Sequence, residues 1–191
     1  MKKIFFGMLI LCMGLLTSCD KCKDKTCENG SSCDSDTGDC VCVCQNGGEC
    51  STADGSCACP TFYTGSTCSI AIRSNYTGSF SGSLGITPGA LTYTREASVN
   101  VDGTDVTKLT VEMDISANPL VPQRETFNIT INDATSSFTV ETKSITDDQN
   151  RTYEYTGSGT ISATELKMTL NGSGIFNGFK ITRDLDYTGT K

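Results

Sequence analysis

Apolar and polar residues alternate along much of the second half of the chain, which is the pattern of half-buried β-strands. Leu109, Val111 and Met113, for example, alternate with polar neighbours. Such alternation places apolar side chains on one face of a strand and polar side chains on the other. Turn signals rich in Gly, Asn and Asp separate the alternating segments. We therefore predict an all-β domain over residues 73–191, with about eight antiparallel strands closed into a barrel or, alternatively, folded as a β-sandwich.

The same alternation indicates which side chains would face the interior of a barrel. An eight-stranded barrel either holds one small ligand or is filled by its own side chains. For a domain of this size we expect a filled core, and a hollow barrel is the alternative. The predicted inward residues are Leu109, Phe127, Phe138, Tyr155, Met168, Phe176 and Phe179.

The chain begins with a continuous apolar run instead of an alternation. Thirteen residues, 4–16, follow Lys2 and Lys3. This length suits the core of a secretory signal peptide and is too short to span a bilayer. We predict that residues 1–18 are a signal peptide. We also predict no transmembrane helix in the mature chain, because no other segment approaches the length of a membrane span.

Cysteine usage divides the chain. All twelve cysteines lie at or before Cys68, with Cys12 inside the apolar run and Cys19 shortly after it. Ordinary cleavage before Cys19 would leave eleven cysteines, an odd number that strands a thiol in an oxidising compartment. Modification of Cys19 leaves ten cysteines, enough for five disulfides.

Residues 16–19, Leu-Thr-Ser-Cys, resemble the lipobox of bacterial lipoproteins. The resemblance implies that Cys19 receives a diacylglyceryl group, becomes the N-terminus after cleavage and is then acylated on its amine. Two or three acyl chains hold a protein stably on a membrane, whereas one chain is marginal. The expected partner is therefore the membrane, through lipid attachment at Cys19. The expected location is the cell envelope, at the outer membrane or the cell surface.

The other cysteines form an internal repeat. The spacing C-x5-C-x6-C-x-C occurs twice, beginning at Cys27 and at Cys44. Residues 19–68 contain too few apolar side chains to bury an adequate core, so disulfides are expected to stabilise this module. Zinc is the alternative use of these cysteines. An exported site built from thiolates alone is not expected, and the chain contains no histidine.

Two segments resemble EGF-like domains. Residues 44–50 (CQNGGEC) match C-x-N-G-G-x-C, and residues 57–68 (CACPTFYTGSTC) match C-x-C-x5-G-x2-C. The single residue between Cys42 and Cys44 and the missing last loop of the upstream copy depart from the family's pattern. The resemblance implies the pairs Cys42–Cys50, Cys44–Cys57 and Cys59–Cys68, with Cys22–Cys33 and Cys27–Cys40 in the upstream copy.

Two segments of the predicted β-domain resemble the lipocalin-like barrel domains of bacterial lipoproteins. They are residues 76–82 (YTGSFSG) and residues 157–162 (GSGTIS). The resemblance implies a lipocalin-like antiparallel barrel and, as one function, a carrier of a small apolar ligand. An immunoglobulin-like sandwich is the alternative fold.

Charge and composition argue against several functions. Removal of Lys2 and Lys3 with the signal peptide takes the net charge from −7 to −9, and no basic patch is apparent, so we expect no nucleic-acid partner. Without histidine there is no imidazole base and no His-activated nucleophile. The carboxylates at 147–148 fall in a predicted hairpin loop, and the acidic turn 34–39 is interpreted as solvated instead of calcium-binding.

These patterns favour a binding protein over an enzyme. We expect no catalytic residues, no metal and no cofactor. The expected function is that of a lipid-anchored, exported surface protein that acts as a non-catalytic interaction or adhesion module for a protein or a glycan. A lipocalin-like carrier of a small apolar ligand is the alternative.

Replacement of the predicted lipid attachment site tests the anchor. Cys19→Ala is expected to abolish incorporation of radiolabelled fatty acid and to release the protein from the membrane fraction, because the acyl chains supply the attachment. Cys12→Ala, within the apolar run, is the matched control and is expected to keep both. Labelling that persists in Cys19→Ala would refute the assignment.

Overall fold

The computed structural model describes residues 21–132 and 136–191. The predicted signal peptide, residues 1–18, and the predicted lipid attachment site, Cys19, lie outside the described residues. Within the described part of the chain, no helix is long and apolar enough to cross a membrane. Apart from the short 3-10 helix η1 (Ile72–Tyr76), the regular structure of these residues is β.

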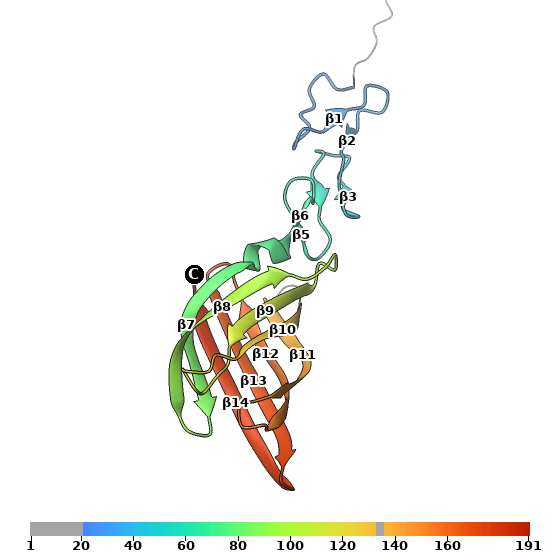
Figure 1. Ribbon diagram of the computed structural model, residues 1–191. Coiled ribbons are helices and arrows are strands. Elements are labelled where there is room, and N and C mark those ends of the chain that lie inside the picture. The colour runs from blue at the N-terminus through green and yellow to red at the C-terminus, as the bar shows by residue number, and fades with distance from the viewer. Residues whose placement is uncertain (1–20, 133–135) are drawn as a thin grey trace, which may run out of the picture. The chain divides into compact units, whose positions relative to one another are not determined.

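The cysteine-rich region is built from tight turns and very short strands (Figure 1). Asn29 and Asn46, at equivalent positions of the two repeats, both have positive φ, and each is followed by a glycine with positive φ. This backbone conformation is the one that Asn-Gly turns provide. Six strands form three two-stranded sheets: β1 (Ser32–Cys33) with β2 (Cys40–Val41), β3 (Glu49–Cys50) with β4 (Cys57–Ala58), and β5 (Tyr63–Thr64) with β6 (Ile70–Ala71).

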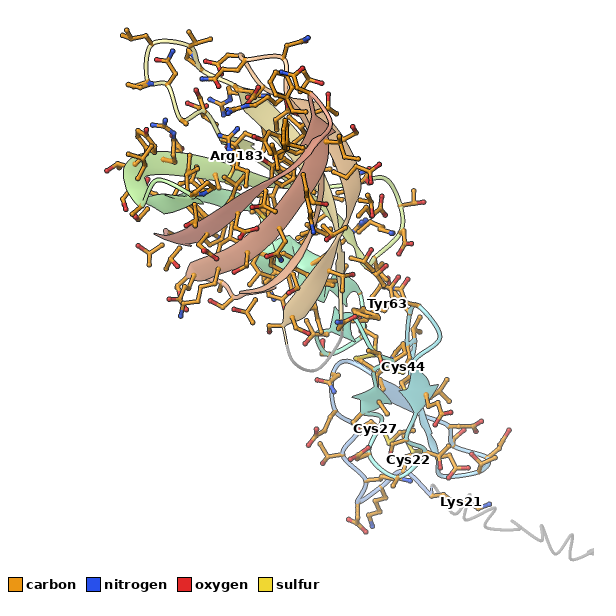
Figure 2. All side chains as sticks on the ribbon, turned by 90° about the horizontal axis from the view of Figure 1, so that it is seen from below. Lys21, Cys22, Cys27, Cys44, Tyr63 and Arg183 are labelled. Atoms are coloured by element: carbon orange, nitrogen blue, oxygen red, sulfur yellow. A yellow bond between two sulfur atoms is a disulfide. The ribbon has the colours of Figure 1, made fainter. Side chains whose placement is uncertain are left out.

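Ten cysteines form five disulfides, some of which are visible beside the labelled Cys22, Cys27 and Cys44 in Figure 2. The pairs are those that the EGF-like resemblance implies. None of these sulfurs is therefore a free thiolate available to zinc. The pairs are Cys22–Cys33, Cys27–Cys40, Cys42–Cys50, Cys44–Cys57 and Cys59–Cys68.

The chain has two compact units, and their division falls inside the cysteine-rich region. One unit comprises the residues up to Val43 together with Cys50–Ser56, and the other comprises Cys44–Glu49 together with Cys57–Lys191. The last EGF-like loop thus belongs to the same unit as the β-barrel. Within that unit Phe62, from this loop, packs against the barrel core.

Eight antiparallel strands form a closed barrel, so the barrel prediction is confirmed and the sandwich alternative is wrong. Each strand pairs with its neighbours in the sequence, and the last strand pairs with the first. The shortest of these pairings joins residues 129–131 to residues 138–140. The strands are β7 (Gly78–Thr87), β8 (Leu91–Val101), β9 (Lys108–Asp114), β10 (Arg124–Ile131), β11 (Ser137–Thr146), β12 (Thr152–Ile161), β13 (Glu165–Phe176) and β14 (Phe179–Thr190).

The barrel interior is filled with apolar side chains, and the outward side chains of the strands are mostly polar. Five of the seven predicted inward residues are at most 2% exposed: Leu109, Phe127, Phe138, Tyr155 and Met168. Phe176 is only partly buried, and the prediction for Phe179 is wrong, because its side chain is 75% exposed. These two residues pair at the tip of the β13–β14 hairpin, which projects from the barrel in Figure 1. An inward-facing position there has no opposite wall to contact.

The seam between β7 and β14 depends on close backbone approach. Gly82 lies opposite Gly189, and a Cβ atom on Gly82 would overlap the carbonyl oxygen of Thr188. The ring of Tyr187 lies over Gly189, and its hydroxyl donates a hydrogen bond of 2.5 Å to the carbonyl of Phe80. Glycine at this seam therefore permits both the strand pairing and the position of the tyrosine ring.

A buried arginine attaches the segment that precedes the first barrel strand to the barrel. Arg73, in η1, is 8% exposed and donates hydrogen bonds to four carbonyl groups of the β8–β9 segment, those of Asp102, Gly103, Asp105 and Lys108. A guanidinium group has five N–H donors and can satisfy several carbonyls at once. Arg73 thus fixes η1 to this end of the barrel, which we call the near end.

Substitution of Gly82 tests whether this position excludes a Cβ atom or whether replacement of any glycine in the strand has the same effect on stability. Gly82→Ala is expected to lower the free energy of unfolding by about 1–3 kcal/mol, the usual cost of overpacking. Gly85→Ala, on the same strand, is the matched control, because its Cβ would lie 3.7 Å from the carbonyl oxygen of Asp186, an ordinary contact. Urea unfolding of the two variants gives the comparison, and equal stabilities would contradict the role assigned to Gly82.

Candidate binding site

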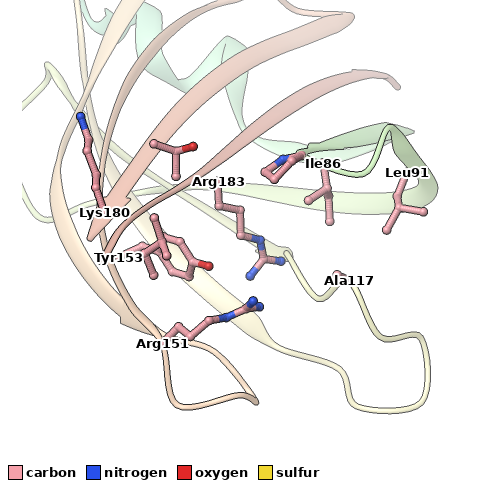
Figure 3. Close-up of a pocket in the computed structure, with 10 residues that line it drawn as sticks. Ile86, Leu91, Ala117, Arg151, Tyr153, Lys180 and Arg183 are labelled. Atoms are coloured by element: carbon pink, nitrogen blue, oxygen red, sulfur yellow. The ribbon is translucent and has the colours of Figure 1, made fainter. Parts of the chain in front are cut away.

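Four loops surround the barrel opening opposite η1, which we call the far end. They connect β7 to β8 (residues 88–90), β9 to β10 (115–123), β11 to β12 (147–151) and β13 to β14 (177–178). A pocket of about 390 Å³ lies at this opening (Figure 3). Its lining includes Ile86, Pro88, Leu91, Ala117, Arg151, Tyr153, Lys180, Ile181, Thr182 and Arg183.

Three polar groups converge in this pocket. The guanidinium group of Arg183, the hydroxyl of Tyr153 and the guanidinium group of Arg151 point toward one another, whereas the ammonium group of Lys180 points away (Figure 3). Arg183 comes from an inward position of β14 and is 7% exposed. Its Nη2 donates a hydrogen bond of 2.5 Å to the carbonyl of Ile115. The mouth of the barrel is therefore apolar on one side and cationic on the other.

Arg151 is held in place by a buried carboxylate. Oδ2 of Asp147 accepts hydrogen bonds from Nε of Arg151 at 2.8 Å and from Nη2 at 2.6 Å. Oδ1 accepts from the backbone N–H groups of Gln149 and Arg151. Burial by itself raises the pKa of Asp147, but these hydrogen bonds and the arginine charge outweigh it, so the pKa is lowered from its ordinary value. The predicted hairpin loop at 147–150 therefore contains an ionised side chain that organises the loop.

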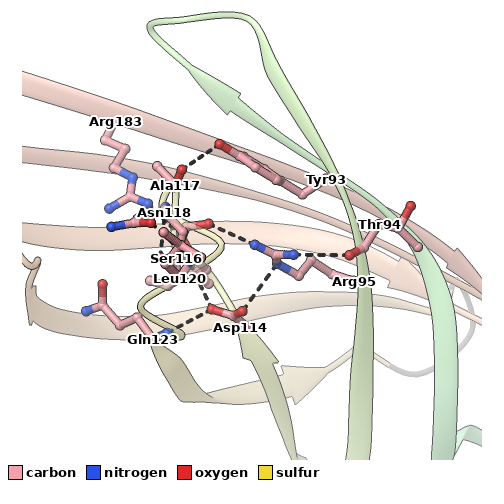
Figure 4. A network of polar contacts seen from close by, with 11 residues as sticks. Tyr93, Thr94, Arg95, Asp114, Ser116, Ala117, Asn118, Leu120, Gln123 and Arg183 are labelled. Atoms are coloured by element: carbon pink, nitrogen blue, oxygen red, sulfur yellow. Dashed lines mark hydrogen bonds and ion pairs between the residues drawn. The ribbon is translucent and has the colours of Figure 1, made fainter.

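The longest far-end loop is also fixed by polar contacts (Figure 4). Oδ1 of Asp114 accepts hydrogen bonds from the backbone N–H groups of Ser116 and Gln123, the two ends of the loop. Nη2 of Arg95 donates to the carbonyl of Ser116 at 3.1 Å, and the Tyr93 hydroxyl donates to the carbonyl of Ala117 at 2.5 Å. Several independent hydrogen bonds thus hold the loop against β8 and β9, which keeps its side of the pocket in place.

A second tyrosine lies close to this site, inside the barrel. Tyr155 is fully buried, and its hydroxyl has no hydrogen-bond partner among the residues that the structure describes. Burial raises the pKa of Tyr155 to about 12, although the nearby charge of Arg183 opposes the shift. Its ring centroid lies 5.9 Å from that of Tyr153. This hydroxyl therefore remains neutral and places an unpaired polar group near the buried guanidinium.

Exposed apolar side chains gather at the far end. In the described part of the barrel, six large apolar side chains are exposed, and five of them lie at or beside the far-end loops. Single exposed apolar residues are normal on protein surfaces, but their concentration around one opening is characteristic of a binding surface. The five are Leu91, Leu120, Val121, Ile175 and Phe179, and the sixth is Val101, at the near end.

Two further carboxylates make contacts within their own surroundings. Oδ1 of Asp186 accepts a hydrogen bond of 2.8 Å from the hydroxyl of Thr169 on the outer barrel surface. In the cysteine-rich region, Oδ1 of Asp34 accepts hydrogen bonds from the backbone N–H groups of Asp36 and Thr37 within its own turn. Asp186 is not among the residues that line the far-end pocket.

The cationic pocket was not predicted from the sequence, although one signal was present. Arg183 lies between Ile181 and Leu185 on β14, at a position where the alternation requires an inward side chain. A charged residue at such a position is unusual and marks a polar site inside the barrel. The convergence of Arg151 and Tyr153 on it depends on the pairing of distant strands, which local alternation does not reveal.

The chain was compared with protein families, curated proteins and solved structures. No protein-family model matches the chain, and no curated protein matches it. Among solved structures, the chain is similar to one described as a "putative outer membrane protein" from Bacteroides fragilis, with a TM-score of 0.47 and 17% sequence identity. The match covers 63% of this chain and 52% of the other, so the chain spans about half the length of that protein.

The buried carboxylate of the β11–β12 loop gives a stability that depends on pH. Asp147→Asn is expected to lower the free energy of unfolding at pH 7 by about 1–3 kcal/mol, because it weakens charge-assisted hydrogen bonds in a buried position. Since the folded-state pKa is lowered, the difference between wild type and variant is present above the ordinary value of 3.8 and disappears as the pH falls through the folded-state pKa.

Urea unfolding at a series of pH values measures this difference. Asp148→Asn, at the neighbouring exposed position, is the control and is expected to change stability little at any pH. A difference for Asp147→Asn that stays constant through the acidic range would show that the carboxylate charge is not the cause.

Proposed function

We propose that this protein is a lipid-anchored, exported surface protein that acts as a non-catalytic interaction or adhesion module. Its binding surface is the far end of the barrel, and its partner is a protein or a glycan. The observation that carries the proposal is the concentration of five of the barrel's six exposed large apolar side chains around this one opening, in the described part of the chain.

The barrel interior supports binding at its surface over storage of a ligand inside it. Side chains that would line a cavity instead fill the core, including the fully buried Leu109, Phe127 and Tyr155. The mouth pocket is lined mainly by aliphatic and cationic groups, with Tyr153 as its aromatic member. A carrier of a small apolar ligand is therefore the less well supported alternative.

Export and lipid attachment complete the proposal. Five disulfides in about fifty residues suit an oxidising compartment outside the cytoplasm. Strand β12 illustrates the outer wall, where Thr152, Glu154 and Thr156 are exposed between buried tyrosines. Because the outward side chains are mostly polar, we attribute membrane attachment to acylation of Cys19 and not to the barrel wall.

Adherence of cells that display the protein tests the proposal. Cells are applied to immobilised mucin, a surface that presents both protein and glycan, and bound cells are counted. Simultaneous Leu120→Ser and Phe179→Ser substitutions are expected to reduce adherence roughly tenfold, because a few buried anchors dominate interface energies. Val101→Ser, which removes an exposed apolar side chain at the near end, is the matched control.

Periodate treatment of the mucin identifies the kind of partner. Loss of adherence after oxidation of the sugars would assign a glycan, and unchanged adherence would assign the protein component. If the far-end variant and Val101→Ser adhere as well as wild type, the far end is not the binding surface and the proposal fails.

A further inference from the structure

The charges at the far-end pocket do not balance. Arg151 is neutralised by Asp147, at 2.6 Å between Nη2 and Oδ2. Among the residues that the structure describes, no carboxylate forms an ion pair with Arg183, and the pocket lining contains no acidic side chain. One buried positive charge therefore remains without a counterion among the described residues.

Arg183 is positioned to bind, and most of its hydrogen-bonding capacity is unused. A guanidinium group carries five N–H donors in a planar fork, and the carbonyl of Ile115 accepts from one nitrogen. The group points to the Tyr153 hydroxyl and to the second guanidinium group, that of Arg151 (Figure 3). Arg183 is 7% exposed as a residue, and an ionised side chain that is so nearly enclosed gains from pairing with an anion.

The surroundings of Arg183 indicate the charge, the shape and the size of the anion that the pocket can bind. Because the ammonium group of Lys180 points away (Figure 3), the one buried unneutralised charge is balanced by a monoanion. The guanidinium fork matches the two oxygens of a carboxylate. Ile86, Leu91 and Ile181 supply an apolar wall of the same pocket. A volume of about 390 Å³ is at the small end of the range for ligand pockets.

We propose that the far-end pocket binds an organic carboxylate that carries a compact apolar group. Arg183 is the primary binding residue and holds the carboxylate through its fork. The Tyr153 hydroxyl donates a further hydrogen bond, and Arg151, fixed by Asp147, contributes its charge. The apolar group lies against the aliphatic wall. This inference rests on the proposed function, because it names the chemistry that the same end of the barrel recognises.

Titration of the purified full-length protein with benzoate tests the inference. Isothermal titration at constant ionic strength is expected to show one saturable site, and the thermal unfolding midpoint is expected to rise with benzoate concentration. Benzamide has the same shape and no charge, and is expected to do neither. Equal responses to benzoate and benzamide, or no response to either, would overturn the inference.

Variants assign the site. Arg183→Gln is expected to weaken benzoate binding by roughly ten- to a hundredfold, the loss typical of a charge-assisted hydrogen bond. Tyr153→Phe keeps the ring and is expected to weaken binding several-fold, which preserves the test if Arg183→Gln folds poorly. Arg124→Gln, at an exposed arginine paired with Glu112 at the start of β10, is the charge-matched control. Equal losses in Arg183→Gln and Arg124→Gln would show a non-specific charge effect and refute the site.

The source of the carboxylate is resolved by a second pair of probes. A tetrapeptide ending in leucine is compared with its C-terminally amidated form. Tighter binding of the free-acid peptide than of benzoate assigns the carboxyl terminus of a polypeptide, and tighter binding of benzoate assigns a free small acid. Because these titrations do not involve adherence to mucin, their failure is distinguishable from a failure of the proposed function.

Discussion

Closure of the barrel depends on the pairing of strands that are farthest apart in the sequence of the domain. Seven residues of β7 pair with seven of β14, and without this pairing both strands would present unpaired edges. Gly82 and Gly189 allow the two backbones to meet. Tyr187 covers Gly189, and its hydroxyl donates a hydrogen bond to the carbonyl of Phe80. The filled core follows from this seam, because a sheet with an open side would not enclose its apolar face.

The strands could be predicted because their signals are local, and the disulfide pairs followed from the resemblance to EGF-like domains. Alternation with a period of two is readable in any single strand, and Leu109, Phe127 and Met168 were placed inward on that basis alone. The positions of Phe176 and Phe179 could not be predicted in the same way, since burial at a strand end depends on how far the opposite wall extends. Where a hairpin is longer than the strands around it, the residues at its tip are exposed even though they follow the inward alternation.

The candidate site shows the same limit more clearly. Arg151 belongs to the β11–β12 loop, Tyr153 to β12 and Arg183 to β14. These segments meet at one opening because β12 and β14 both pair with β13. The inward arginine was visible in the sequence as a break in an apolar alternation. The group that neutralises Arg151 was also visible, but as an acidic turn of the kind found in many loops. The sequence did not show that Arg151, Tyr153 and Arg183 lie at the same opening of the barrel.

The entry of the chain through η1 has a mechanical consequence. Arg73 fastens η1 to the near end, and Nζ of Lys191 donates a hydrogen bond of 2.8 Å to the carbonyl of Thr77, so the first and last strands are tied at that same end. A partner bound by the far-end loops would transmit tension along the length of the strands. The interstrand hydrogen bonds would then be loaded in shear, many at once, instead of being broken one after another, so that a larger force would be needed to unfold the barrel along this direction.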